Sequence, residues 1–141
     1  MMPGLLGSPL FLRMLATLAV ITAGLLLYRL VSYLTLRRAG MHSPGFERAS
    51  HGKPVLLYFT TPTCTPCKTI QRPAIRRLQE LAGGQVEVVE IDASARPDLA
   101  TQWGVLSVPT TFLIDANGKP RHVNYGVTGT EKLLDQLNEL V

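Results

Sequence analysis

The chain has 141 residues, a net charge of +4 and a hydrophobic fraction of 46%, which allows one modest domain and a short appendage. Residues 1–46 carry all of the net charge, with four arginines and no acidic residue, whereas residues 47–141 carry ten basic and ten acidic side chains. A nucleic-acid-binding protein needs a basic surface on its folded part. The folded part here is neutral, so we expect no nucleic-acid partner.

The first element along the chain is an apolar segment at residues 14–36, which follows a short tail at residues 1–13 and contains one charge, Arg29. As an α-helix it spans roughly 34 Å at about 1.5 Å per residue, enough to cross a hydrocarbon core of about 30 Å. Two tyrosines near its C-terminal end and the Arg37–Arg38 pair just beyond it are typical of a membrane interface. The pattern predicts a single-pass transmembrane anchor in the lipid bilayer.

Two other interpretations of this segment are weaker. A secretory signal peptide has a shorter apolar run, followed by a small-residue cleavage site, and no such site follows Leu36. The helix of a soluble core does not need to be apolar on all sides over this length. We therefore favour an anchor that is not cleaved.

The orientation of the anchor follows from its flanking charges. Arg29, Arg37 and Arg38 lie toward the C-terminal side, against Arg13 and the α-amine on the other side. The positive-inside rule thus places the folded domain in the cytoplasm, by a margin of one or two charges. The opposite, extracytoplasmic orientation is the alternative.

Residues 37–50 mix glycine, proline, serine and charges without periodicity and predict a linker, with a first helical turn around residues 46–51. The domain that follows is placed at residues 51–141. Its first segment, VLLYF at residues 55–59, is continuously apolar and predicts a strand buried on both faces. A turn with two prolines follows and leads into Cys64-Thr65-Pro66-Cys67.

Helical spacing resumes after the cysteines and ends at Gly83-Gly84. The residues that we predict to face inward on this helix are Ile70, Ala74, Ile75, Leu78, Leu81 and Ala82. The later elements are predicted to be a strand, a short helix, a hairpin of two strands and a last helix, at residues 86–92, 97–103, 110–115 with 121–125, and from 128 onward.

Two local signals support the last elements. Asn117-Gly118 is the strongest short hairpin signal in the chain. Thr128 to Glu131 fits a capping box at the start of the last helix, whose inward residues are Leu133, Leu134, Leu137 and Leu140. The order β, α, β, α, β, β, α predicts an α/β fold with a mixed central sheet flanked by helices.

The two cysteines are the candidate chemistry. Three residues apart, they close too short a loop to stabilise a fold by much. Cys64 falls at the N-terminus of a predicted helix, where free backbone N–H groups and the helix dipole favour a thiolate. Cys67 lies one turn deeper, close enough to resolve a mixed disulfide formed on Cys64. A zinc site would need two more ligands, and the three histidines show no paired spacing. Redox chemistry is the favoured interpretation.

From about Lys53 to Leu140 the chain resembles the thioredoxin family. The resemblance rests on the segments VLLYF, CTPC, VEIDAS, Trp103-Gly104-Val105, Val108-Pro109-Thr110, DANGK and Gly126, which occur in the family's order.

The resemblance implies a thioredoxin-like fold and a thiol–disulfide oxidoreductase. Cys64 would be the attacking thiol and Cys67 the resolving thiol. Pro109 would be a cis-proline facing them, and Val108 would offer backbone hydrogen bonds to a substrate strand. The expected substrate-binding residues are Thr63, Thr65, Pro66, Val108 and Pro109.

The expected partners are proteins with disulfides and a thiol reductant or reductase that supplies electrons. The sequence has no phosphate-binding glycine loop and no flavin or nicotinamide fingerprint, so we expect no cofactor and no metal, and a monomer. Two alternatives remain open: an extracytoplasmic oxidoreductase for envelope protein or cytochrome assembly, and a non-catalytic interaction module with a thioredoxin fold.

The sequence also departs from the family pattern. Thr63 and Thr60 replace two usual tryptophans, and Thr65 replaces a frequent glycine. The usual buried aspartate and its lysine partner are Tyr58 and Val88; their joint loss is coherent, because either charge buried alone would be costly. The helix proline, Pro73, comes one position later than usual. These departures leave open how the resolving thiol loses its proton, through water or through the Tyr58 hydroxyl.

Overall fold

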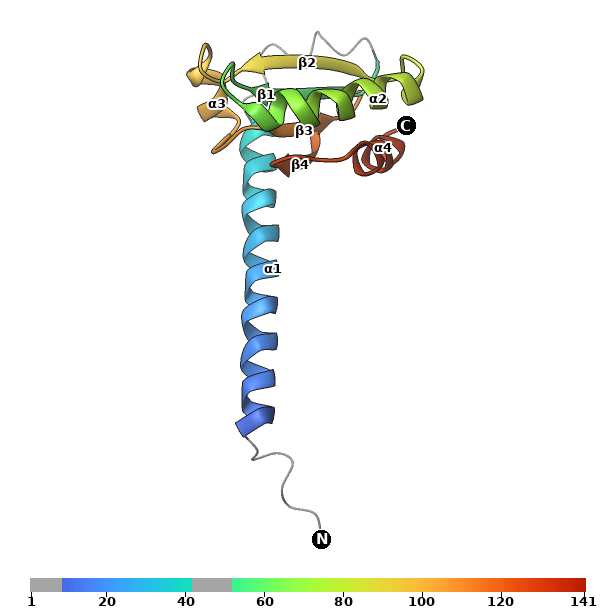
Figure 1. The fold of residues 1–141 in the computed structure, drawn as a ribbon. Helices are drawn as coiled ribbons and strands as arrows, with labels where there is room; N and C mark the ends of the chain where they lie inside the picture. The colour runs from blue at the N-terminus through green and yellow to red at the C-terminus, as the bar shows by residue number, and fades with distance from the viewer. Residues whose placement is uncertain (1–8, 42–51) are drawn as a thin grey trace. The chain divides into compact units, whose positions relative to one another are not determined.

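The computed structural model describes residues 9–41 and 52–141 (Figure 1). Helix α1 spans Pro9–Met41 and thus extends beyond the predicted anchor at both ends. The remainder of the predicted linker and its helical turn lie outside the described residues. Within α1, Pro9–Arg37 is apolar and long enough to cross a membrane, and its most apolar window is not buried against other described residues. A signal sequence would pass the same length and composition test.

The folded domain is built on a four-stranded sheet. Strands β1 (Val55–Thr60), β2 (Glu87–Asp92), β3 (Thr110–Ile114) and β4 (Pro120–Tyr125) are arranged in the order β2-β1-β3-β4. β1 pairs in parallel with β2, while β3 is antiparallel to both β1 and β4. The predicted mixed sheet is confirmed, with β1 at its centre.

Helices cover the two faces of the sheet. Helices α2 (Arg72–Ala82) and α4 (Thr130–Asn138) belong to the core with Leu56 and Tyr58, whereas α3 (Pro97–Gln102) lies with the core of Leu57 and Phe59. Successive side chains of a strand point to opposite faces, so β1 needs apolar residues at every position. All six of its residues are buried, as the unbroken VLLYF run predicts.

Trp103 anchors the second of these cores. It is 2% exposed, and its ring meets Phe112 edge-on at 5.0 Å and Phe59 at 6.5 Å between centroids. Edge-to-face aromatic pairs at such distances are favourable. Trp103 is therefore a core residue.

The hairpin between β3 and β4 forms where predicted. Gly118 has φ of 79°, a left-handed conformation that glycine adopts without steric cost. The Asp115 carboxylate accepts hydrogen bonds from the backbone N–H groups of Asn117 at 2.9 Å and Lys119 at 3.0 Å. These bonds give the backbone N–H groups of the turn a partner within the turn, and they direct the chain back into β4.

The predicted capping box is wrong. α4 begins at Thr130 with Gly129 at the N-cap, and no side chain caps it. The backbone N–H of Thr128 instead donates to the side-chain oxygen of Gln71 at 2.8 Å. A buried contact with another helix has thus replaced the local cap. The predicted inward leucines are confirmed: Leu133 and Leu137 are buried, and Leu134 and Leu140 pack against them.

The helix after the cysteines begins with a π-helical turn, η1 (Cys67–Gln71), which continues into α2. The backbone N–H of Arg72 donates to the carbonyl of Cys67, five residues back. A π-turn holds one residue more than an α-turn. It therefore accommodates the extra residue that delays Pro73, which enters α2 in its first turn.

This turn changes which side chains face inward. Ile70 and Leu81, predicted to be inside, are 54% and 50% exposed. Gln71 is fully buried in place of Ile70, and Ile75, Leu78 and Ala82 continue the buried face. The wider turn at residues 67–71 accounts for Ile70, because the prediction assumed uniform α-helical geometry. Leu81 lies in the regular helix α2, so the turn does not explain its exposure.

Candidate active site at the cysteine pair

Cys64 and Cys67 form a disulfide, with 5.3 Å between their Cα atoms. Cys64 comes after the turn that leaves β1 and directly before the first helical residues, and Cys67 opens the π-turn. The two cysteines differ in access: Cys64 is 9% exposed and Cys67 is fully buried. An incoming sulfur can therefore approach Cys64 more easily than Cys67.

A backbone donor faces the sulfur of Cys64. The N–H of Cys67 points at Cys64 Sγ from 3.3 Å, and the carbonyl of Cys64 accepts the N–H of Lys68 at 3.4 Å. Free N–H groups at a helix N-terminus carry partial positive charge. A thiolate at Cys64 would receive a charge-assisted hydrogen bond there, which favours the nucleophilic form of the thiol.

The other predicted site residues lie around the pair. Thr63, Thr65 and Pro66 are exposed beside Cys64. Val108 packs against the core cluster that contains both cysteines. The Val108–Pro109 peptide bond is cis, as the resemblance predicted.

Pro109 itself is buried, and it lies directly before β3. Its carbonyl accepts the backbone N–H of Gly126 at 2.8 Å. The loop that carries Val108 and Pro109 is thus tied to the end of β4.

Tyr58 lies beneath the pair, where the family usually has an aspartate. Its hydroxyl donates to the carbonyl oxygen of Cys67 at 3.3 Å, and the residue is 1% exposed. Burial raises the pKa of Tyr58 above its ordinary value, a hydrogen bond with Thr60 opposes the rise, and the charge of Glu90 adds to it. Tyr58 is therefore protonated at neutral pH and is directed at a carbonyl, not at a sulfur. This geometry disfavours Tyr58 as the base for Cys67 and favours water.

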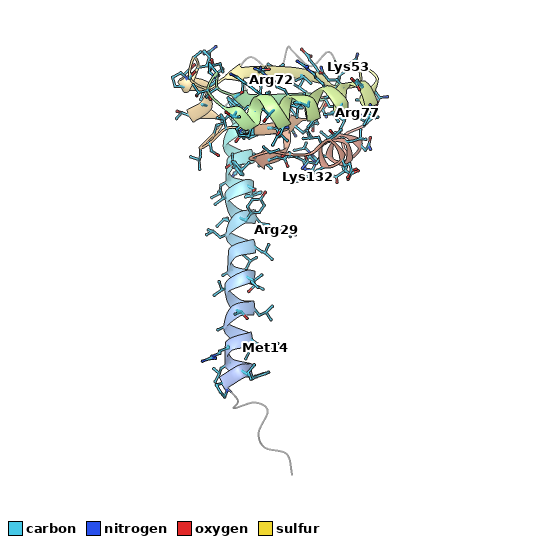
Figure 2. All side chains as sticks on the ribbon, viewed as in Figure 1. Met14, Arg29, Lys53, Arg72, Arg77 and Lys132 are labelled. Carbon is cyan, nitrogen blue, oxygen red and sulfur yellow. A yellow bond between two sulfur atoms is a disulfide. The ribbon has the colours of Figure 1, made fainter. Side chains whose placement is uncertain are left out.

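A hollow of about 240 Å³ adjoins Tyr58 between α2 and β2. Arg72 lies at its rim, next to β2 (Figure 2), and pairs with Glu90 at 2.5 Å. Lys68, Arg72 and Arg76 lie four residues apart, and the middle one of the three is held in this ion pair. The hollow is large enough to hold water, but neither cysteine lines it.

We expect Tyr58→Phe to destabilise the domain by about 0.5–1.5 kcal/mol at neutral pH, the usual net value of one hydrogen bond. A second effect depends on pH. Above about pH 10 an unfolded chain releases the tyrosine proton while the folded chain retains it, so wild-type stability falls as pH rises through this range. Tyr58→Phe lacks the titrating hydroxyl and therefore this loss. The difference in free energy of unfolding between wild type and variant thus becomes smaller as pH rises. Urea unfolding between pH 7 and about pH 11 measures this, and a constant difference contradicts it.

Sequence reasoning missed Gln71. It lies between two predicted inward residues, Ile70 and Ala74, and was not itself among them. The one available signal was the displaced Pro73, which indicated an additional residue between the cysteines and the helix proline. A displaced proline does not say which side chain turns inward.

The domain and the pair together define a class. A dithiol at a helix N-terminus, with one slightly exposed and one fully buried cysteine, can exchange disulfides without a cofactor. Each step only breaks one sulfur–sulfur bond, forms another and moves protons. The chain is therefore an α/β domain with a thiol–disulfide oxidoreductase site.

Comparison with known proteins identifies the family. The thioredoxin family model matches residues 44–139, more than half of the chain, so the chain belongs to the thioredoxin family and is a thiol–disulfide oxidoreductase. A thioredoxin-like protein of Synechocystis sp. is 34% identical over 66% of this chain and 87% of its own length. The thioredoxin of Bacillus subtilis is 32% identical over 60% of this chain and 80% of its own.

Solved structures agree in fold. A mutant thioredoxin from Halobacterium salinarum superposes with a TM-score of 0.58 at 28% identity, over 65% of this chain and 78% of that one. A chloroplastic thioredoxin z gives a TM-score of 0.60 at 24% identity, over 67% and 84%. All of α1 precedes the part matched by the family model.

Proposed function

We propose that this protein reduces disulfides in other proteins at Cys64 and Cys67 while α1 holds it at a membrane. The observation that carries the proposal is the asymmetric pair: a slightly exposed cysteine at a helix N-terminus and a fully buried cysteine one turn deeper. This arrangement supplies an attacking thiolate and a resolving thiol in one turn of chain.

The reaction has two exchange steps. The Cys64 thiolate attacks one sulfur of the substrate disulfide, forming a mixed disulfide and releasing the other substrate sulfur as a thiolate that takes a proton. Cys67 then loses its proton and attacks Cys64 Sγ, which forms the Cys64–Cys67 disulfide and releases the second substrate sulfur. Two electrons pass from the protein to the substrate. Water accepts the proton of Cys67.

The substrate strand lies along the exposed residues Thr63, Thr65 and Pro66 and along the Val108–Pro109 loop. No described residue is seen to donate to or accept from the backbone of Val108, so its N–H and C=O are available to an extended substrate. A backbone contact of this kind recognises many sequences, because every peptide offers the same groups.

The oxidised protein must be reduced again. A thiol reductant or a reductase protein supplies the two electrons by the same exchange at Cys64. The protein works as a monomer, because a complete pair and its loop lie within one chain.

The tether is the second part of the proposal. Residues 14–36 lie within a helix whose apolar side chains are exposed over most of its length, as expected of a segment that lipid covers. The arginines toward the C-terminal side favour a cytoplasmic domain, where reduced thiols are maintained.

The full chain in detergent tests the chemistry, with insulin as the disulfide substrate and dithiothreitol as the reductant. We expect insulin reduction well above the rate with dithiothreitol alone. A rate equal to that background overturns the proposed activity.

Reporter fusions after Val141 test the orientation. An enzyme reporter active only in the cytoplasm is expected to be active, and one that requires export is expected to be silent. The reverse pattern would replace the cytoplasmic reductase with an extracytoplasmic oxidoreductase for envelope or cytochrome assembly. Release of the fusion from the membrane after processing would instead identify the N-terminal helix as a signal peptide.

A further inference from the structure

Gln71 occupies a position that ordinary core packing does not explain. It is fully buried in the π-turn, four residues after Cys67, while the neighbouring Ile70 is 54% exposed. A buried polar residue beside an exposed apolar one reverses the usual pattern. Such local conflicts tend to mark functional positions, and π-turns inside helices are frequent at functional sites.

Both ends of the Gln71 amide are used. Nε2 donates to the carbonyl of Thr128 at 3.1 Å, and Oε1 accepts the N–H of Thr128 at 2.8 Å. The Thr128 residue is 4% exposed. The Gln71 side chain thus makes two hydrogen bonds to the backbone of Thr128. Together they fix both the distance and the orientation between the π-turn and the Thr128 backbone.

The backbone that Gln71 holds leads directly to the other wall of the site. Two residues before Thr128, the N–H of Gly126 donates to the Pro109 carbonyl at 2.8 Å. The Gln71 amide and this bond therefore connect the turn that carries Cys67 to the Val108–Pro109 loop. Further along α2, the Thr130 hydroxyl donates to the carbonyl of Ala74 at 3.1 Å, so the same segment is fastened to α2 a second time.

We propose that Gln71 is a positioning residue that sets the spacing between the cysteine pair and the Val108–Pro109 loop. This inference rests on the proposed reduction of protein disulfides. A protein substrate must reach Cys64 and the loop at once, so it is sensitive to their spacing. A small disulfide needs the cysteine pair but not the loop. Misplacement of about 1 Å in a site can cost as much as about 100-fold in rate.

Gln71→Met tests the proposal, since methionine is similar in length but makes neither bond. In the full chain we expect kcat/KM for insulin to fall about tenfold, mainly through KM, because the lost interaction orients substrate binding. The rate with a small disulfide, such as hydroxyethyl disulfide, should change by less than about twofold, because the variant leaves Cys64 in place at the N-terminus of the helix. The ratio of the two rates is the readout.

Gln136→Met is the matched control. Gln136 also forms a two-point amide pair, with Asn124 at 2.8 Å and 3.0 Å, but it joins α4 to β4 and involves neither the turn of Cys67 nor the backbone of Thr128. Its loss should lower stability by a comparable amount and leave the ratio unchanged. An equal change of the ratio in both variants, or no change in Gln71→Met, overturns the proposal.

Gln71→Glu gives an independent readout that also serves if Gln71→Met does not fold. A protonated carboxyl can donate to the Thr128 carbonyl and accept its N–H, whereas an ionised carboxylate can only accept. The insulin to small-disulfide ratio should therefore approach the wild-type ratio near pH 5 and fall away near pH 8, since burial favours the protonated form. A defect that is the same at both pH values contradicts a positioning role. If wild type reduces the small disulfide but not insulin, the proposed function fails.

Discussion

Replacing Cys64 with serine is expected to abolish disulfide reduction. A serine hydroxyl is not ionised at neutral pH and cannot form a mixed disulfide, so no later step can begin. We expect the insulin reduction rate of Cys64→Ser to fall by roughly 10³-fold or more, down to the rate of dithiothreitol alone, since loss of a nucleophile can cost an enzyme on the order of 10⁶ in kcat.

Cys67→Ser is the matched variant that separates the two cysteines. It retains the accessible thiol but lacks the buried resolving thiol, so the first exchange occurs and the second does not. We expect Cys67→Ser to accumulate a covalent complex with its substrate, visible on a non-reducing gel and released by dithiothreitol. The same complex on Cys64→Ser would reverse the two assignments. A cellular role that Cys64→Ser leaves intact would favour a non-catalytic interaction module.

The sheet and the cysteine site were predictable because both depend on short-range patterns. The unbroken apolar run in β1 indicates burial on both faces, and Asn117-Gly118 indicates the hairpin. The two cysteines directly after a buried strand indicate a helix N-terminus. Each signal lies within a few residues of the structure that it specifies, so no tertiary knowledge was needed.

The position of Gln71 and the start of α4 were not predictable for a common reason. Thr128 has a suitable sequence for a local cap, but its backbone pairs with Gln71 across the domain. Gln71 itself turns inward only because the first turn of the helix is π-helical. Gln71 and Thr128 are far apart in sequence, and they hydrogen-bond to each other instead of to groups nearby in the chain. Periodicity within one segment cannot reveal such a long-range pair.

The same limit applies to Tyr58. Its place in an apolar strand indicated that it is buried, and comparison with the family pattern indicated that a carboxylate is missing. Only the structure shows that the hydroxyl meets the carbonyl of Cys67. That contact makes Tyr58 a support for the π-turn, in which the same carbonyl also accepts the N–H of Arg72.

The second large effect is expected from Trp103→Ala, which should lower the free energy of unfolding by about 3–5 kcal/mol. The indole is packed between Phe59 and Phe112, and neither strand can move inward to fill the cavity, because both are central in the sheet. A loss of this size is a large share of the stability of a small domain. Urea unfolding of the full chain, followed by far-ultraviolet circular dichroism, measures it.

Leu106→Ala is the control for that measurement, because Leu106 lies three residues later and is 85% exposed. Its truncation should change stability by no more than about 0.5 kcal/mol.

Trp103 also affects the substrate-binding loop, through the segment of chain that follows it. The turn that follows it, closed by the N–H of Val105 on the carbonyl of Ala100 at 2.8 Å, leads into the Val108–Pro109 loop. Trp103→Ala should therefore weaken insulin reduction more than reduction of a small disulfide, even where the domain remains folded. Equal losses for both substrates would mean that Trp103 supports the fold and not the loop.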